Sequence, residues 1–293
     1  MRRAFVETTQ SLVEKDSRVA VLLGDIGVFA FRNIIAQNPS RVFNIGILEQ
    51  STVSLASGMS AEGFFPIVHT IAPFLVERAY EQIKIDFCYQ KLGGNFVSVG
   101  ASYDYAALGC THHCPGDIDI LKNLPSMELI IPGTAKEFSY LLSSLYNNEK
   151  PTYFRLSEIQ NKTTFDIKTF EAKVIKRGTK ANVIAVGSAL DIVLDAVLDL
   201  DVTVLYYHSL RPFDHQTLKD CSISKKFLLC EPYYQGYLQS LVIDTFKGEF
   251  LRIESIGVPR EFQTNYGSVH QHNLNLGLTA KNVRSRIEDL SRE

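Results

Sequence analysis

The sequence has 293 residues, of which 45% are hydrophobic and 21% are charged. This balance is typical of a folded globular chain with room for about two domains, and it excludes a wholly disordered one. The 30 basic and 32 acidic residues give a net charge of −2, which disfavours nucleic-acid binding through a broad basic surface.

The N-terminal segment and the cysteines both indicate a cytoplasmic protein. Residues 1–10 carry two arginines but no apolar stretch of the secretory type, and no run of about eighteen apolar residues predicts a membrane span. The five cysteines are odd in number and widely spaced, which disfavours a disulfide framework. Cys110, His112, His113 and Cys114 crowd one loop, but zinc sites usually draw a second pair of ligands from elsewhere, so we expect no metal here.

Predicted strands and helices alternate along the first half of the chain, as in parallel α/β units. The expected strands cover 19–23, 42–45, 66–70, 95–99, 129–131 and 152–155. The expected helices cover about 4–15, a short segment before 42, about 49–61, a segment ending near 89, and a segment after Thr134. The stretch 100–116 shows no period, and loops after strands are the usual place for ligand-binding groups in such folds.

A second α/β unit follows a polar, aperiodic segment at 157–172, which we interpret as a linker. Its expected strands cover 182–186, 202–206, 226–230 and 251–256, and its expected helices lie from about 189, after Pro212, around 236–247 and at about 279–291. The sequence therefore predicts two consecutive, mostly parallel α/β domains, at 1–156 and 173–293.

Two segments are candidates for chemistry. In the first, 44–50, a strand ends at a glycine turn and Glu49 opens a helix, where its charge could serve catalysis or simply complement the helix dipole. In the second, the loop 109–116, His112 and His113 could carry protons or could be ordinary hydrogen-bonded loop residues.

These segments resemble the pyrimidine-binding domain of the transketolase family. The resemblance lies in FNIGILEQ at 43–50, RAYEQIKID at 78–86 and GCTHHCPGDIDIL at 109–121. The later segments PTYFRLSE, ANVIAVGSAL, LRPFD, LLCEP, GVPREF and GLTAKNV follow the C-terminal domain of the same family in order. The resemblance therefore covers nearly the whole chain.

The resemblance implies a thiamine diphosphate cofactor and a role for each of several residues. Glu49 is expected to hydrogen-bond N1′ of the aminopyrimidine, and His112 to face the thiazolium and the substrate. Phe74 is expected to stack on the pyrimidine, although Leu75 is an alternative in register and an ordinary core position is an alternative for Phe74.

Two further positions are expected near the same pocket. His69 is a candidate substrate-binding residue. Asp25, in a Gly-Asp-Ile-Gly turn, either helps to complete the cofactor pocket or is an ordinary residue of a strand-end turn.

The family holds the diphosphate through a divalent metal on a Gly-Asp-Gly segment followed by an asparagine. Neither 24–26 nor 116–118, which read Gly-Asp-Ile, continues in that way. The resemblance therefore implies the C-terminal half of a split transketolase, with Mg²⁺ held by an N-terminal partner subunit that carries the Gly-Asp-Gly motif. The dimeric family architecture then implies an α2β2 assembly.

Three positions depart from the family pattern for sugar phosphates. The acidic residue that meets sugar hydroxyls falls on Leu108, the phosphate-facing histidine on Gly100, and the phosphate-binding arginine on Glu158. We therefore expect an altered substrate site at Glu158, and at least one substrate that is a modified or nucleotide-linked sugar.

The leading functional hypothesis is transfer of a two-carbon ketol unit from a ketose to an aldehyde. One alternative is another thiamine diphosphate enzyme, either a 2-oxoacid-decarboxylating β subunit or a deoxyxylulose-phosphate synthase. Another is a non-catalytic regulatory half, which the three departures favour and the retained Glu49 and His112 disfavour.

Overall fold

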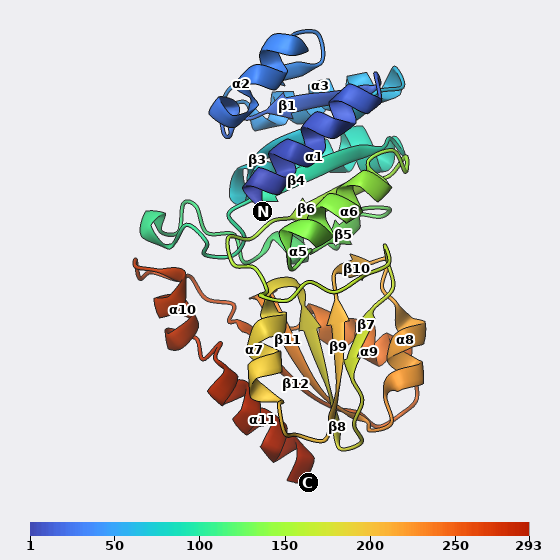
Figure 1. The fold of residues 1–293 in the computed structure, drawn as a ribbon, viewed down its shortest axis with the longest axis vertical. Helices are drawn as coiled ribbons and strands as arrows, with labels where there is room; N and C mark the ends of the chain where they lie inside the picture. Colours follow the sequence, from blue (N-terminus) through green and yellow to red (C-terminus); the bar gives the residue numbers. More distant parts are fainter. Residues whose placement is uncertain (293) are drawn as a thin grey trace.

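The computed structural model describes residues 1–292, which form two α/β units, one above the other in Figure 1. The first unit contains a seven-stranded sheet with the order β10-β5-β6-β4-β3-β1-β2. All its pairs are parallel except β10 with β5. The strands are β1 (Val19–Leu23), β2 (Val42–Asn44), β3 (Phe65–Ile71), β4 (Gly94–Val99), β5 (Glu128–Ile130), β6 (Pro151–Arg155) and β10 (Ser209–Arg211).

The second unit contains a five-stranded sheet with the order β12-β11-β8-β9-β7, in which only β7 runs antiparallel to its neighbour. Its strands are β7 (Lys173–Lys176), β8 (Ala181–Val186), β9 (Val202–Tyr207), β11 (Lys226–Tyr234) and β12 (Arg252–Val258). The prediction of two mostly parallel α/β sheets is confirmed.

Helices cover both sheets. The α-helices are α1 (Arg2–Lys15), α2 (Val28–Gln37), α3 (Glu49–Ala61), α4 (Tyr80–Gln82), α5 (Asp117–Leu121), α6 (Ala135–Leu145), α7 (Leu190–Ala196), α8 (His215–Cys221), α9 (Tyr237–Thr245), α10 (Val269–Asn275) and α11 (Ala280–Arg292). The π-helical turns are η1 (Phe74–Arg78) and η2 (Ile83–Tyr89), and the 3₁₀ turns are η3 (Ala106–Leu108) and η4 (Gly187–Ala189). Among residues 1–292, no helix combines the length and apolar character needed to cross a membrane.

One hydrophobic core joins the two units. Leu75 and Phe87, on one side of the first sheet, belong to the same cluster of buried side chains as Tyr207 and Phe227 of the second sheet. The other face of each sheet has its own cluster, under α1 and α6 in the first unit and under α7 and α11 in the second. Strands covered on both faces are buried along their length, which explains their continuous apolar sequences.

Each sheet has a topological switch point, where the chain leaves two neighbouring strands toward opposite edges of the sheet. In the first sheet β1 lies between β2 and β3, and in the second β8 lies between β9 and β11. Ligands of open α/β sheets bind at the carboxyl ends of the strands beside such points.

Several elements differ from the sequence predictions. The helix expected to end near residue 89 is instead two π-helical turns around the short α4. The strands β7 and β10 and the helix α10 were not predicted, because they are only three to seven residues long and such short segments show no clear hydrophobic period. Of these, β10 returns from beyond the expected linker to complete the edge of the first sheet. The division at 157–172 remains a proposal.

Candidate functional site

Glu49 is the first residue of α3, directly after β2 and the turn at Gly46. Its side chain is only 6% exposed, and the Arg78 guanidinium donates to both carboxylate oxygens over 3.3 and 3.4 Å. The start of a helix favours a negative charge, which stabilises the carboxylate at this position. Arg78 lies in RAYEQIKID, but no sequence signal assigned it a role.

Phe74 and Leu75 are neighbours in η1, but their side chains have different surroundings. Leu75 is fully buried in the core, whereas the Phe74 ring lies 3.9 Å beneath the Arg78 guanidinium. The ring of His112 meets Phe74 edge-on, with 5.3 Å between centroids. π-Helical turns often occur at functional sites. The geometry places Phe74, and not Leu75, beside the Glu49–Arg78 pair.

His112 lies in the loop after η3. Its Nδ1 and the Thr111 hydroxyl are hydrogen-bonded over 2.9 Å, and its ring is perpendicular to that of Tyr105, with 6.1 Å between centroids. Glu49, Arg78, Phe74 and His112 therefore form a continuous series of contacts from α3 through η1 to this loop. Two of the predicted catalytic residues are thus brought into one site.

His69 and Asp25 line a cavity of 720 Å³ at the β1–β3 switch point. His69 is buried against the Phe5 ring, 4.3 Å away between centroids, and its Nδ1 lies 2.8 Å from the Val97 carbonyl oxygen. Asp25 is exposed, has a left-handed φ of 57°, and accepts a 3.0 Å hydrogen bond from the Asn44 amide. This pairing links the carboxyl ends of β1 and β2, five residues before Glu49.

Burial, with a smaller effect of Arg2, lowers the pKa of His69 to about 4. The imidazole is therefore neutral at pH 7, with the Nδ1 hydrogen donated to Val97 and Nε2 left as an acceptor.

This pKa predicts a pH-dependent loss of stability. Between pH 6.5 and 4 the unfolded chain binds a proton at His69 that the folded chain does not, so stability falls as the pH is lowered through this range, by roughly 3 kcal/mol in all. Urea unfolding at pH 7 and at pH 4.5 should show a smaller difference for His69→Asn than for wild type. Exposed His270, replaced in the same way, is the control; equal pH dependence in all three proteins would contradict the assignment.

Glu158 is exposed, and its carboxylate lies 3.8 Å from the Arg2 guanidinium. Arg2 also stands 5.3 Å above the Tyr105 ring, and both it and Glu158 line a smaller cavity of 270 Å³ beside Gly100. Glu158 is therefore paired with a cation from α1. No motif indicated Arg2, because its partners are distant in the sequence.

Tyr105 explains the glycine at position 100. Gly100 has a φ of 80°, and a Cβ there would lie 2.4 Å from a Tyr105 ring carbon. The tyrosine thus fills the space that a side chain at this position would need. The Tyr105 hydroxyl is buried and meets no hydrogen-bond partner among residues 1–292.

Behind the site, a buried ion pair joins the loop to the second unit. Arg155 Nε donates to Asp117 over 2.7 Å, and Arg155 Nη2 donates to the Ser102 hydroxyl over 2.7 Å. Ser102 in turn donates to the Pro232 carbonyl oxygen over 2.5 Å. Burial alone would lower the pKa of Arg155, but Asp117, together with Tyr153 and Asp104, outweighs this effect and the pKa is raised.

The cysteines of the histidine-rich loop do not converge on one point. Cys110 is exposed, whereas Cys114 is buried with its Sγ 3.7 Å from Glu77 Oε1. Within residues 1–292, no group of three His, Cys, Asp or Glu side chains is placed to hold a metal ion.

Comparison with known proteins adds independent information. Residues 1–163 match the family model of the transketolase pyrimidine-binding domain. A protein of Rhodococcoides fascians, described as an uncharacterized 33.6 kDa protein in the fasciation locus, is 37% identical over 98% of this chain and 93% of its own length. A protein of Phocaeicola vulgatus, described as one of the subunits of apulose-4-phosphate transketolase, is 25% identical over 96% of this chain and 94% of its own.

A similar fold occurs in a solved structure described as a split gene transketolase, inactive beta4 tetramer. Its TM-score is 0.85 at 24% identity, and the match covers 99% of this chain and 97% of that one. The chain therefore belongs to the transketolase pyrimidine-binding family, and it has the two-domain fold of the C-terminal half of a split transketolase-like enzyme.

Proposed function

We propose that this chain supplies the pyrimidine-binding half of a thiamine diphosphate site and, with a partner subunit, transfers a two-carbon ketol unit from a ketose to an aldehyde. The observation that carries the proposal is the series of contacts from buried Glu49 through Arg78 and Phe74 to His112. It combines an acid, an aromatic ring and an imidazole, the groups needed to hold and orient an aminopyrimidine beside a reacting carbonyl.

The chemistry of these groups fits the cofactor. Thiamine diphosphate, when bound, supplies the electron sink for breaking and remaking a carbon–carbon bond next to a ketone. The Glu49 carboxyl would hold a proton at N1′ of the pyrimidine, and the Phe74 ring would pack on the pyrimidine face. Because Thr111 engages Nδ1 of His112, Nε2 is the atom that would exchange a proton with a substrate hydroxyl.

Arg78 is compatible with this arrangement. Its bonds to Glu49 are long, at 3.3 and 3.4 Å, and half of its side chain is exposed. A donor at N1′ could therefore share the carboxylate without first breaking a buried ion pair.

The surroundings of Glu49 support an interface with a partner subunit. Ile47, Leu48 and Leu55 are each about half exposed or more, although they flank a buried carboxylate. Exposed apolar side chains around a polar site favour burial against another protein. We propose that this partner carries the Gly-Asp-Gly motif with Mg²⁺ and the diphosphate, and that two copies of each chain assemble as α2β2 in the cytoplasm.

The substrate remains a sugar in this proposal. The similar protein of Phocaeicola vulgatus is named for apulose-4-phosphate, which supports a phosphorylated or otherwise modified sugar. Arg2 and Glu158, which both line the cavity beside Gly100, favour a substrate that offers hydroxyl groups as well as an anion. We therefore keep the hypothesis that at least one substrate differs from the ordinary pentose phosphates.

Reconstitution with the partner tests the function. We expect the chain to copurify from its host with a second protein that contains Gly-Asp-Gly, and the pair with Mg²⁺ and thiamine diphosphate to transfer ketol units. Transfer from ordinary pentose phosphates at the rate of a housekeeping transketolase would contradict the substrate hypothesis. Release of CO₂ from a 2-oxo acid would instead assign the chain to a decarboxylating enzyme, and a chain that neither copurifies nor binds the cofactor would favour a non-catalytic half.

A further inference from the structure

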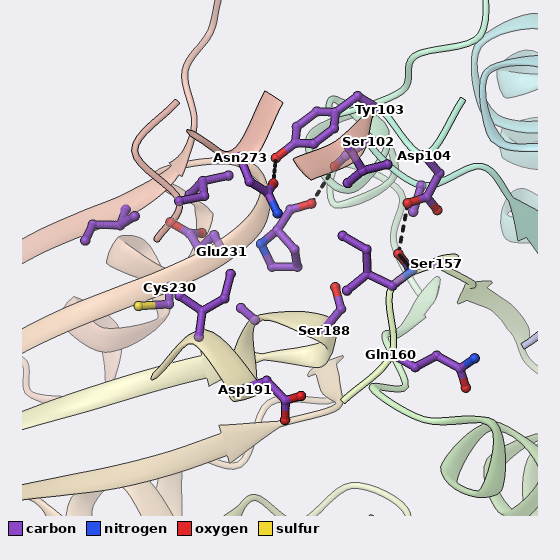
Figure 2. Close-up of a pocket in the computed structure, with 18 of the residues that line it drawn as sticks. Ser102, Tyr103, Asp104, Ser157, Gln160, Ser188, Asp191, Cys230, Glu231 and Asn273 are labelled. Atoms are coloured by element: carbon purple, nitrogen blue, oxygen red, sulfur yellow. Dashed lines mark hydrogen bonds between the residues drawn. The ribbon is translucent and has the colours of Figure 1, made fainter. Parts of the chain in front are cut away.

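A third cavity, of 170 Å³, lies between the two units (Figure 2), and neither Glu49 nor Phe74 is among the residues that line it. Its floor is the switch point of the second sheet, where Ser188 and Asp191 follow β8 and Glu231 lies near the end of β11. Segments that follow β4 and β6 of the first unit, including Asp104 and Ser157, close the opposite side. Both domains therefore contribute carboxyl strand ends to one enclosed space, the usual place for a ligand in such folds.

The walls are mostly apolar. Five of the lining residues are Ile159, Ile192, Pro232, Ile256 and Leu278. A cavity of this volume accommodates a compact hydrocarbon group, because even about 150 Å³ is enough for benzene in a protein interior. An apolar body of about that size therefore fits the space.

The acidic residues that line the cavity are Asp104, Asp191 and Glu231, against one basic residue, Arg155. Asp104 is 8% exposed, and it accepts hydrogen bonds from the Ser157 hydroxyl at 3.0 Å and from the Glu158 backbone at 2.9 Å. The cation that reaches the cavity, Arg155, is already paired with Asp117. Asp104 thus keeps a negative charge that no ion pair among residues 1–292 neutralises within 4 Å.

The energetics of Asp104 agree with this description. Burial raises its pKa to about 6, against the opposing effect of its hydrogen bonds and of Arg155. A carboxylate that is costly to ionise gains more from a cation placed beside it than an exposed one does. The Ser188 hydroxyl points toward the middle of the cavity in Figure 2 and offers a second polar contact.

We propose that this interdomain cavity is a second small-molecule site, for a ligand with a compact apolar body and one ammonium group that pairs with Asp104. The ammonium group would donate to the Asp104 carboxylate and the apolar body would pack on the isoleucines of α7 and β12. The proposal is independent of the reaction at Glu49.

Three probes of equal size and different charge test the proposal: benzylamine, benzyl alcohol and benzoate. Each is titrated into the full chain at pH 8, where the Asp104 carboxyl is ionised, and binding is followed by ligand-detected NMR. We expect benzylamine to bind at least about tenfold more tightly than benzyl alcohol, the ratio given by one charge-assisted hydrogen bond. Benzoate should bind more weakly than either.

Two variants locate the binding. Asp104→Asn keeps the shape of the side chain and should reduce the affinity for benzylamine to that for benzyl alcohol. Ser188→Leu fills the cavity and should abolish binding of both probes, even if Asp104→Asn fails to fold. Asp195→Asn, which changes an exposed carboxylate on α7 outside the cavity, is the matched control and should bind benzylamine as wild type does.

The contrary results are equally distinct. Benzyl alcohol or benzoate binding as tightly as benzylamine would overturn the assignment of an ammonium ligand. Undiminished benzylamine binding by Ser188→Leu would place the probe elsewhere and overturn the site.

Discussion

Replacing Glu49 with glutamine is expected to lower the ketol-transfer rate of the reconstituted enzyme by about 10²- to 10⁴-fold, the range for loss of a positioned acid–base group. The amide has nearly the same shape as the carboxyl, so the start of α3 should form as before. It cannot hold a transferable proton at N1′ of the pyrimidine. The rate is measured with partner, Mg²⁺ and saturating cofactor, so that weaker cofactor binding does not account for the loss.

The matched control is Glu62→Gln, an exposed carboxylate at the end of the same helix. It should leave the rate unchanged. Circular dichroism and urea unfolding should give the same curves for both variants. A Glu49→Gln enzyme as fast as wild type would mean that the acid of this site lies elsewhere.

Replacing Arg155 with methionine is expected to cost about 3–5 kcal/mol of unfolding free energy, because it leaves the charge of Asp117 buried without its partner. Both side chains are almost completely inaccessible to solvent. The loss should appear as a lower urea midpoint at pH 7. Arg284→Met, which breaks the surface pair with Asp199, should change the midpoint little.

A double variant separates charge from packing. Asp117→Asn combined with Arg155→Met removes the uncompensated charge, so it should recover part of the stability that Arg155→Met loses. If the double variant is as unstable as the sum of the two single variants, the ion pair is not the source of the effect and lost packing is.

The sequence predicted the regular elements best where one local signal dominates. The strand at 19–23 and the helix at 49–61 agree with β1 and α3 to the residue. Each is specified by its own residues: the strand by a continuous apolar run, and the helix by small residues after an acidic first residue. The turn at Phe74 was ambiguous for the opposite reason. The segment forms a π-helical turn in which Leu75 is buried in the core and Phe74 is not, and the order of residues alone does not reveal which of the two is buried.

The residues of the candidate site also differ in how far the sequence could predict them. Glu49 and His112 were found through motifs, and the geometry brings both to one site by way of Arg78 and Phe74. Arg2 was missed because its partner, Glu158, is distant in sequence. Tyr105 was missed because it belongs to no motif, although its ring occupies the space that a side chain at Gly100 would need. The roles of all these residues in catalysis and binding stay predictions.

The strand β10 has a consequence for how this chain can evolve and be engineered. The first sheet is completed by residues 209–211, which lie beyond the expected linker at 157–172, and the Ile131 amide also donates to the His208 carbonyl oxygen over 2.7 Å. Exchange of the second unit at residues 157–172 would therefore replace β10 with the strand of another protein, and a poorly matched strand would leave β5 open to pairing with foreign strands. A crossover after Arg211 would keep β10 but would divide the second sheet, because β7, β8 and β9 precede that point and β11 and β12 follow it. A chimera built from two such proteins should therefore take β5 and β10 from the same parent.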